Sequence, residues 1–495
     1  MASSHRSQLL WSYTSTLSST FLQAVAAVTI TRFVAPAEYG LVALAMLCCR
    51  FPNYLSQLGM SRAVVQKPDL SEGNVRAAFT LSMGLGLAGC LAIAALSPLL
   101  ARFFHEPRLT PVLLILSLNF ILQGAILVSG GLLRRALKMR QLAIADTLSY
   151  LISTFAMGLP IAIKGYGAWA IVASTVTQTL FTAMLYYAAS PHALLPTLRR
   201  SDYEHIVGFG GKATVTSIVE GLGSSMDTLV LGKFSTAFNV GLYSRSFLLI
   251  GLPVLNLSNG LTQVLFSRFS RASEQGSADA FDLLARSQRV FLAIVFPLCA
   301  GAAGAASCIV LTLYGSKWTS AIPVFAILCA VTAADASFHL PAVQMEALGR
   351  FRHKMIVQFL YMICIGGGVL LSVAHGLVMV GVTLTGLQLC RSLGLQYYTG
   401  KYLNRGFMVM MSSWVPGLIA AIPVGVSIAY VAWLLRANYG MPPVLQLFVC
   451  ILTGLAVSST VYATLFRSSV FVPLIMLIRI RQSDPPAQGE RLQKT

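Results

Sequence analysis

The chain has 495 residues, of which 56% are hydrophobic and only 10% are charged, and its formal net charge is +19. A mean hydropathy of +0.74 is incompatible with the polar surface that a water-soluble protein of this size needs, so the composition indicates many membrane-spanning helices. Membrane proteins concentrate Lys and Arg in their cytoplasmic loops, which explains the basic excess without a nucleic-acid partner.

Fourteen segments are long and apolar enough to cross a bilayer, which takes about 20 residues of helix. They are 9–31, 39–61, 77–100, 110–132, 143–163, 168–190, 206–231, 238–262, 288–313, 319–345, 355–374, 377–399, 412–435 and 443–466. The sequence therefore predicts an all-α polytopic membrane protein with about fourteen transmembrane helices. Only His375-Gly376 separates two of these spans, but one unbroken helix there would far exceed the thickness of a bilayer.

The basic residues of the short loops predict the orientation of the chain. If the N-terminus is cytoplasmic, 26 Lys and Arg residues lie on the cytoplasmic side, including three in 391–405, and 7 lie on the other side. Both termini are therefore expected in the cytoplasm. The remaining two of the 35 basic residues, Arg50 and Arg245, fall inside spans.

Two stretches 201 residues apart are similar without a gap. Arg32-Phe33, Gly40-Leu41, Pro52 and Gly59 align with Lys233-Phe234, Gly241-Leu242, Pro253 and Gly260. This repeat predicts an N-lobe of six helices in 1–200, a C-lobe of six in 201–405, two further helices in 406–480 and a polar cytoplasmic tail in 481–495. Both copies face the same way, because six helices separate them, so we expect a pseudo-twofold axis along the membrane normal and a cleft between the lobes.

No group of residues has the spacing of a catalytic, metal or cofactor site. The segment from Gly84 to Gly89 fits the pattern G-x-G-x-x-G, but it lies inside the span 77–100, where small residues allow helices to pack closely. The nine cysteines are scattered through apolar spans without histidine partners. The sequence therefore predicts no enzyme and no bound metal or cofactor.

One predicted helix, 206–231, carries a polar stripe. Lys212, Thr216, Glu220, Ser224 and Asp227 follow one another at spacings of four, four, four and three residues, so they share one face, which we expect to line the cleft. Arg245 on the next span lies at a similar depth to Asp227. This placement indicates a structural ion pair between the two residues or, alternatively, a role for Arg245 in contacting a substrate.

Other polar groups at membrane depth are few. Arg50 lies near the middle of 39–61 with no acid at comparable depth in the first four helices, which favours an anionic ligand such as a phosphate, since a guanidinium binds phosphate oxygens bidentately. Carbonyls, water or an acid of the other lobe are the alternative partners. Asp335 and His339 are spaced i, i+4 and form a proton relay or a buried hydrogen-bonded pair. Uncharged polar side chains suited to sugar binding, or to tying helices together, are Gln23, Asn53, Gln57 and Asn256.

Four segments carry a family resemblance. They are Thr31-Arg32-Phe33-Val34-Ala35-Pro36-Ala37-Glu38-Tyr39-Gly40, Gly165-Tyr166-Gly167-Ala168-Trp169-Ala170, Asp227-Thr228-Leu229-Val230-Leu231-Gly232 and Gly241-Leu242-Tyr243-Ser244-Arg245. In this order and spacing they resemble the polysaccharide-transport (Wzx-type) oligosaccharide flippases. The resemblance implies the fold of the multidrug/oligosaccharidyl-lipid/polysaccharide exporter superfamily, in which two six-helix lobes enclose a cavity that opens alternately to either side of the membrane.

The resemblance also implies a substrate and a location. The cargo would be an undecaprenyl-diphosphate-linked oligosaccharide, moved from the cytoplasmic to the periplasmic leaflet of the bacterial inner membrane for capsule, O-antigen or exopolysaccharide assembly. Membrane lipids, the polysaccharide polymerase and the export machinery are the expected partners. Substrate contacts are expected from the polar residues of both lobes named above, and ion coupling from Asp335 and His339.

Three other functions remain open. A flippase for the peptidoglycan precursor lipid has the same needs. A multidrug cation antiporter shares the fold, but it would use carboxylates, and the span 9–31 has none. A membrane-embedded glycosyltransferase or polymerase would show long outer loops with catalytic groups, and every predicted outer loop is short.

Overall fold

The computed structural model describes residues 25, 28–57, 70–197, 199, 221, 223, 225–439 and 441–466, and all its regular elements are helices. Internal contacts group the chain into two compact units. Unit 1 comprises Met1–Arg245, Leu313–Ala321 and Ile365–Leu377, and unit 2 comprises Ser246–Thr312, Ile322–Cys364 and Val378–Thr495. These units differ in their bounds from the predicted lobes, whose division at residues 200 and 405 stays a prediction.

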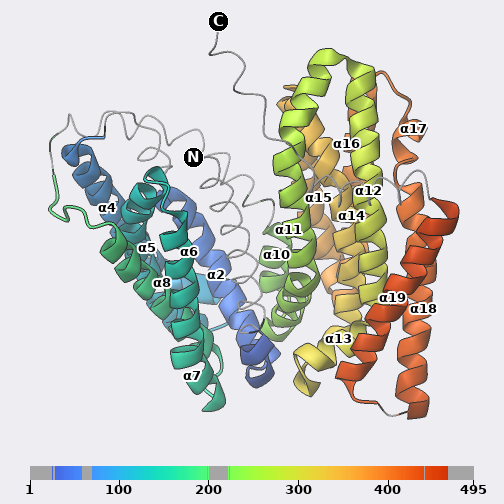
Figure 1. The fold of residues 1–495 in the computed structure, drawn as a ribbon. Helices are drawn as coiled ribbons and strands as arrows, with labels where there is room; N and C mark the ends of the chain where they lie inside the picture. The colour runs from blue at the N-terminus through green and yellow to red at the C-terminus, as the bar shows by residue number, and fades with distance from the viewer. Residues whose placement is uncertain are drawn as a thin grey trace, which may run out of the picture. The chain divides into compact units, whose positions relative to one another are not determined.

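Unit 1 is a bundle of long helices (Figure 1). Its helices are α2 (Pro36–Gln57), α4 (Glu72–Phe103), α5 (Leu109–Arg135), α6 (Met139–Leu151), α7 (Leu159–Ile163), α8 (Ala168–Ala189) and α10 (Met226–Phe234). The π-helical turn η1 (Ile152–Gly158) joins α6 to α7, and the 3-10 turn η3 (Ser316–Trp318) also belongs to this unit. Helix α5 packs against α2, α4 and α8, so it lies at the centre of the bundle.

Two local features of the sequence shape α4: a capping residue starts the helix, and a glycine lets it approach α5 closely. Ser71 caps α4, since its hydroxyl accepts a hydrogen bond from the backbone N–H of Asn74 at 3.2 Å while the Asn74 side chain accepts one from the Ser71 N–H. Further along, a Cβ added to Gly86 would lie 2.5 Å from the Phe120 carbonyl oxygen of α5, so only glycine permits this approach. The packing role predicted for the Gly84–Gly89 segment is therefore confirmed at Gly86.

The two copies of the predicted internal repeat contact each other within unit 1, where α2 crosses the start of α11 (Ala237–Gln275). A Cβ added to Gly40 would lie 1.6 Å from the Ala237 carbonyl oxygen, and one added to Gly241 would lie 1.8 Å from the Pro36 carbonyl oxygen. Both pairs of positions are 201 residues apart in the chain. This reciprocal contact is what a local two-fold axis between the two helix starts produces.

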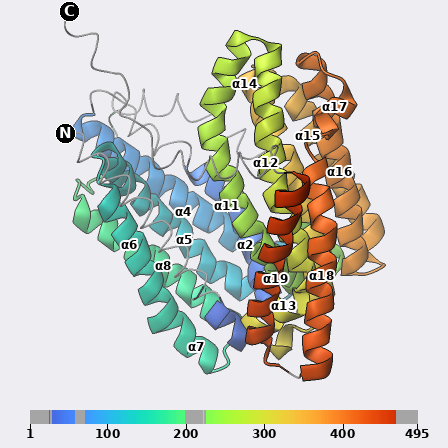
Figure 2. The ribbon, with the colours of Figure 1, turned by 45° about the vertical axis from the view of Figure 1, so that its right-hand side comes forward.

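Unit 2 contains the remaining helices, with part of α15 and the first residues of α11 assigned to unit 1. They are α11, α12 (Ser277–Gly304), α13 (Ala306–Leu313), α14 (Ala321–Ala347), α15 (Phe351–Val373), α16 (Leu377–Tyr402), α17 (Phe407–Met411), α18 (Val415–Tyr439) and α19 (Pro443–Leu465). Helix α18 packs against both α12 and α19, and Figure 2 shows α18 and α19 side by side.

Eleven helices in the described part of the chain are long and apolar enough to cross a membrane. The predicted span 39–61 overlaps α2, which is not among the eleven, and most of the predicted spans 9–31 and 206–231 lies outside the described residues. The all-helical, multi-pass architecture is thus confirmed, while the count of fourteen stays a prediction. The segment between the predicted spans 238–262 and 288–313 is mostly helical, because α11 continues to Gln275 and α12 begins at Ser277.

Candidate functional site

A polar pocket of about 250 Å³ lies inside unit 1, among α2, α5 and α8. Each helix contributes two polar residues about one turn apart, which places both on the same face of that helix. The lining residues are Met46, Cys49, Arg50, Asn53, Leu116, Asn119, Phe120, Gln123, Thr175 and Thr179. The structure thus brings together the predicted residues Arg50 and Asn53 and adds four polar residues that the sequence reasoning missed.

Arg50 provides the charge of this pocket. Its Nη1 donates a hydrogen bond to the Ser225 hydroxyl at 2.6 Å, and within the described residues it has no ion pair shorter than 4.0 Å. Asp227 is close enough to interact with it electrostatically. Because the side chain is exposed and only one of its donors is accounted for by the described residues, Arg50 retains donors for an anionic ligand.

The uncharged groups of the pocket supply mainly acceptors. The Asn119 side-chain oxygen is buried, and none of the described residues donates a hydrogen bond to it. The hydroxyls of Thr175 and Thr179 donate to the carbonyl oxygens one turn earlier in α8, at 2.8 Å and 2.9 Å, which leaves their oxygen lone pairs to accept. Buried acceptors of this kind need a hydroxyl donor from water or from a ligand.

The predicted ion pair between Asp227 and Arg245 is wrong, since no contact within 4.0 Å joins these two described residues. The Asp227 carboxylate instead accepts hydrogen bonds from the Thr228 backbone N–H at 2.6 Å and from the Tyr243 hydroxyl. The Arg245 guanidinium lies over the Tyr39 ring, 3.9 Å from its centroid. Asp227 and Arg245 therefore make their close contacts with uncharged groups and not with each other.

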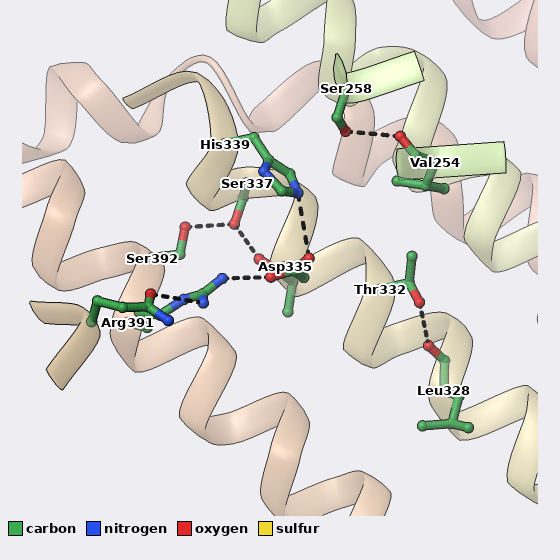
Figure 3. A network of polar contacts seen from close by, with 11 residues as sticks. Val254, Ser258, Leu328, Thr332, Asp335, Ser337, His339, Arg391 and Ser392 are labelled. Atoms are coloured by element: carbon green, nitrogen blue, oxygen red, sulfur yellow. Dashed lines mark hydrogen bonds and ion pairs between the residues drawn. The ribbon is translucent and has the colours of Figure 1, made fainter. Parts of the chain in front are cut away.

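A second polar cluster lies in unit 2 (Figure 3). His339 Nε2 is 3.4 Å from an oxygen of Asp335 one turn earlier on α14, so the predicted shared face is confirmed. The other Asp335 oxygen accepts a hydrogen bond from Arg391 of α16. Arg391 also donates to the Gln358 side chain at 3.3 Å, and the rings of Phe338 and Tyr361 lie 3.9 Å and 4.4 Å from its guanidinium carbon.

The placement of Arg391 corrects the sequence analysis, which counted this residue in a cytoplasmic loop. It lies well inside α16 and is only 9% exposed. The clue in the sequence was the apolar segment on both sides of it, which predicted a span to residue 399. A charged side chain at this depth usually has a polar partner, and Asp335 provides one for Arg391.

Apart from Asp227 and Arg245, one further predicted residue in the described part of the chain lies outside both sites. Asn256 lies on α11 in unit 2 and is exposed. Gln23, Lys212 and Glu220 lie outside the described residues, as does the side chain of Gln57, so the polar stripe predicted on 206–231 stays a prediction. No cluster of three or more metal-ligating side chains occurs in the described part of the chain.

An all-helical chain with many spans and polar groups at membrane depth defines a multi-pass membrane protein. A family model described as "Polysaccharide biosynthesis protein" matches residues 29–323, so the chain belongs to this family.

Curated relatives include the lipopolysaccharide biosynthesis protein WzxC of Escherichia coli, 26% identical over 65% of both chains. The teichuronic acid biosynthesis protein TuaB of Bacillus subtilis is 23% identical over 65% of this chain and 66% of its own. The succinoglycan biosynthesis transport protein ExoT of Rhizobium meliloti is 23% identical over 64% of both chains. These similarities therefore span slightly less than two thirds of the relatives' length.

Two solved structures have a similar fold. The lipid II flippase MurJ in an inward closed conformation has a TM-score of 0.70 at 13% identity, covering 92% of this chain and 99% of its own. An inward-facing multidrug resistance MATE transporter of the MOP superfamily has a TM-score of 0.59 at 12% identity, covering 77% and 94%. At these identities the likeness concerns the fold.

Proposed function

We propose that this protein is a flippase that moves a polyprenyl-diphosphate-linked oligosaccharide from the cytoplasmic to the periplasmic leaflet of a bacterial inner membrane. The Arg50 pocket carries the proposal, because it combines one guanidinium with amide and hydroxyl groups inside a membrane bundle. A diphosphate binds to a guanidinium, and sugar hydroxyls form hydrogen bonds with amide and hydroxyl groups. The relatives named for lipopolysaccharide and succinoglycan biosynthesis support a saccharide cargo.

The cargo also carries a long apolar chain, and unit 2 has a surface suited to it. A pocket of about 450 Å³ lies among α12, α18 and α19, and Ile294, Leu298, Ile428 and Leu455 are among its mostly apolar lining residues. An isoprenoid chain fits such a surface because burial of apolar area is its main interaction. Delivery of the saccharide to a polymerase and to the export machinery belongs to the same proposal.

Coupling to an ion is assigned to the cluster in unit 2. Arg391 and His339 contact opposite oxygens of the same carboxylate, and acidic and histidine side chains inside the membrane are typical of proton relays in transporters. His339→Gln should lower export at normal membrane abundance, and full export by this variant would contradict the assignment.

Complementation of a flippase-null strain tests the Arg50 pocket. Arg50→Lys keeps the charge but loses the planar fork, so export of polymer should fall strongly, as in Arg50→Ala. Asn119→Leu removes an oxygen without a described protein partner and should lower export while leaving membrane abundance normal. Ser117→Ala is the matched control, because this residue of α5 contacts Cys90 of α4 instead of the pocket. Normal export by abundant Arg50→Ala protein would refute the proposal.

The alternative functions give different results. A peptidoglycan precursor flippase would rescue cells depleted of their lipid II flippase, whereas we expect no rescue. A multidrug cation antiporter would use carboxylates in the pocket, but the described lining residues include one cation and no carboxylate. Drug resistance that depends on Arg50 would favour the antiporter.

A further inference from the structure

A second pocket of unit 1 has no role in the proposed transport step. It measures about 500 Å³, within the range of ordinary small-ligand sites, and lies where α2, α5 and α8 begin. Its lining residues are Phe33, Ala35, Glu38, Leu41, Arg108, Pro111, Val112, Gly165, Tyr166, Gly167, Ala168, Trp169 and Lys317. Two of the four segments that carry the family resemblance form most of its wall.

Glu38 lines this pocket, and both oxygens of its carboxylate are hydrogen-bonded. One oxygen of its carboxylate accepts a hydrogen bond from Arg108 Nη1 at 2.8 Å, and the other accepts one from the Ala168 backbone N–H at 2.9 Å. Gly167 allows this contact, since its φ is +57° and an added Cβ would lie 2.7 Å from the carboxylate. The polar groups of the pocket are thus fixed before any ligand arrives.

Aromatic side chains surround the opening. Trp169 is 39% exposed, Phe33 42% and Tyr166 61%, and all three line the same pocket. Gly165, beside Tyr166, leaves the adjacent space open, because an added Cβ would meet nothing within 4 Å. Exposed rings next to fixed donors and acceptors suit a ligand with an apolar face and a polar edge.

The charges of the pocket decide between a phosphate and a neutral ligand. Arg108 contacts both Glu38 and Glu106, at 2.8 Å and 2.9 Å, and these hydrogen bonds raise its pKa. The Lys317 ammonium donates to the Phe33 carbonyl oxygen at 3.3 Å. The lining thus carries two cations and one carboxylate, and Glu106, outside the lining, offsets part of the charge of Arg108, so the site offers directional hydrogen bonds with a small net charge.

We propose that this pocket, formed by Glu38, Arg108, Lys317 and the rings of Tyr166 and Trp169, is a binding site for one neutral hexopyranose unit. The C–H face of the sugar stacks on Trp169, and its hydroxyls bind the spare oxygen lone pairs of Glu38 and the unused donors of Arg108 and Lys317. This inference rests on the proposed function for the choice of a saccharide. It adds a second sugar site, separate in its residues from the Arg50 pocket.

Saturation-transfer NMR on the full chain in lipid nanodiscs, prepared without glycoside detergents, tests this site. The probes are methyl glucopyranoside and methyl galactopyranoside, with glycerol phosphate as a lipid-headgroup probe. Trp169→Ala should weaken the sugar signal about tenfold, the effect of losing roughly 1.4 kcal/mol of stacking. Trp433→Ala is the matched control, because this tryptophan of α18 is also exposed but lies in unit 2. Trp169→Phe should keep most of the signal.

The outcomes separate the two proposals. If neither sugar gives a signal, or if Trp169→Ala and Trp433→Ala behave alike, the hexopyranose site is refuted even when Arg50 variants lose export. A Trp169-dependent signal from glycerol phosphate alone would also refute it and would mark a lipid-headgroup site. If Trp169→Ala fails to fold, Tyr166→Ala replaces it with the same expectation. Sugar binding together with full export by Arg50→Ala would refute the proposed function alone.

Discussion

Arg50 of unit 1 and Arg391 of unit 2, two of the three arginines at membrane depth, differ in how many of their hydrogen-bond donors the described residues use. Arg50 makes one hydrogen bond to Ser225 among the described residues and remains exposed in a polar pocket. Arg391 is 9% exposed and is held by a carboxylate, an amide and two aromatic rings. The first arrangement suits a residue that binds a ligand, and the second suits a residue that stabilises its own unit.

Neutralising Arg391 should therefore destabilise unit 2. Arg391→Gln leaves Asp335 without its cation, and we expect a loss of at most about 3 kcal/mol, because the carboxylate is partly exposed. The double variant Asp335→Asn, Arg391→Gln should recover much of this loss, since no uncompensated charge remains. Membrane abundance and thermal melting of the purified variants measure both effects, and a double variant as unstable as Arg391→Gln would contradict the pairing.

His192 should make the docking of the 190–197 segment pH-dependent. Its Nε2 lies 3.1 Å from the Ser129 hydroxyl, and the rings of Phe79 and Tyr187 lie 5.3 Å and 5.5 Å from its ring. Burial lowers the pKa of this histidine below its usual 6.5. As the pH falls, His192 therefore binds a proton more readily in the undocked segment than in the docked one. The free energy of docking is fully favourable above the usual histidine pKa, and docking weakens as the pH falls through the lowered pKa.

Amide exchange of residues 190–197 measures this effect. After correction for the intrinsic pH dependence of exchange, these amides of the wild-type protein should exchange faster at about pH 5.5 than at about pH 7.5. The usual histidine pKa, near 6.5, lies between the two conditions. His192→Gln removes the titrating group and should abolish the difference. Equal protection at both pH values in wild-type protein would show that the histidine does not control docking.

Sequence reasoning located Arg50, Asn53, Asp335 and His339, because unusual polar residues stand out in apolar helices. It missed Asn119, Gln123, Thr175 and Thr179, although each pair is spaced i, i+4 in an apolar span. The spacing shows that two residues share a face, but it does not show which neighbour that face meets. Arg391 was missed for another reason, since a basic residue near the end of a span reads equally well as part of a loop.

At the level of helices, hydropathy located most boundaries well. The turn at His375-Gly376 is confirmed, since α15 ends at Val373, α16 begins at Leu377 and Gly376 has a φ of +94°. The π-helical turn η1 was not predicted, because a change of hydrogen-bond register leaves no trace in hydropathy. The helical ends of α11 and α12 were also missed, since a polar helix outside the bilayer resembles a loop in hydropathy.

The crossing of α2 and α11 depends on two glycines, and substitution there should be costly. In Gly40→Ala the new methyl group would overlap the Ala237 carbonyl oxygen, so the helices must separate, with an expected loss of about 1–3 kcal/mol or more. Gly84→Ala is the control, because a Cβ there meets nothing within 4 Å and alanine favours helix by roughly 0.5–1 kcal/mol. Thermal melting of both variants gives the comparison, and equal melting temperatures would contradict the close crossing.

For the whole molecule, the orientation in the membrane is the main prediction still to be tested. Moving Arg391 from the loops into α16 changes the predicted cytoplasmic count of basic residues from 26 to 25, against 7 on the other side. This small change does not alter the expected orientation, because the bias is set by many short loops. The number of spans decides whether the two ends of the chain share a side.

Reporter fusions at three positions test orientation and span number together. A fusion after Leu137, between α5 and α6, should make green fluorescent protein fluoresce, because this turn is predicted to be cytoplasmic. A fusion after Gly165, between α7 and α8, should activate alkaline phosphatase in the periplasm. A fusion after Arg467 should fluoresce again if the number of spans is even. Phosphatase activity at Arg467, with the expected results after Leu137 and Gly165, would mean an even number of spans after Gly165. It would then place the C-terminus outside the cytoplasm and contradict fourteen spans with both termini inside.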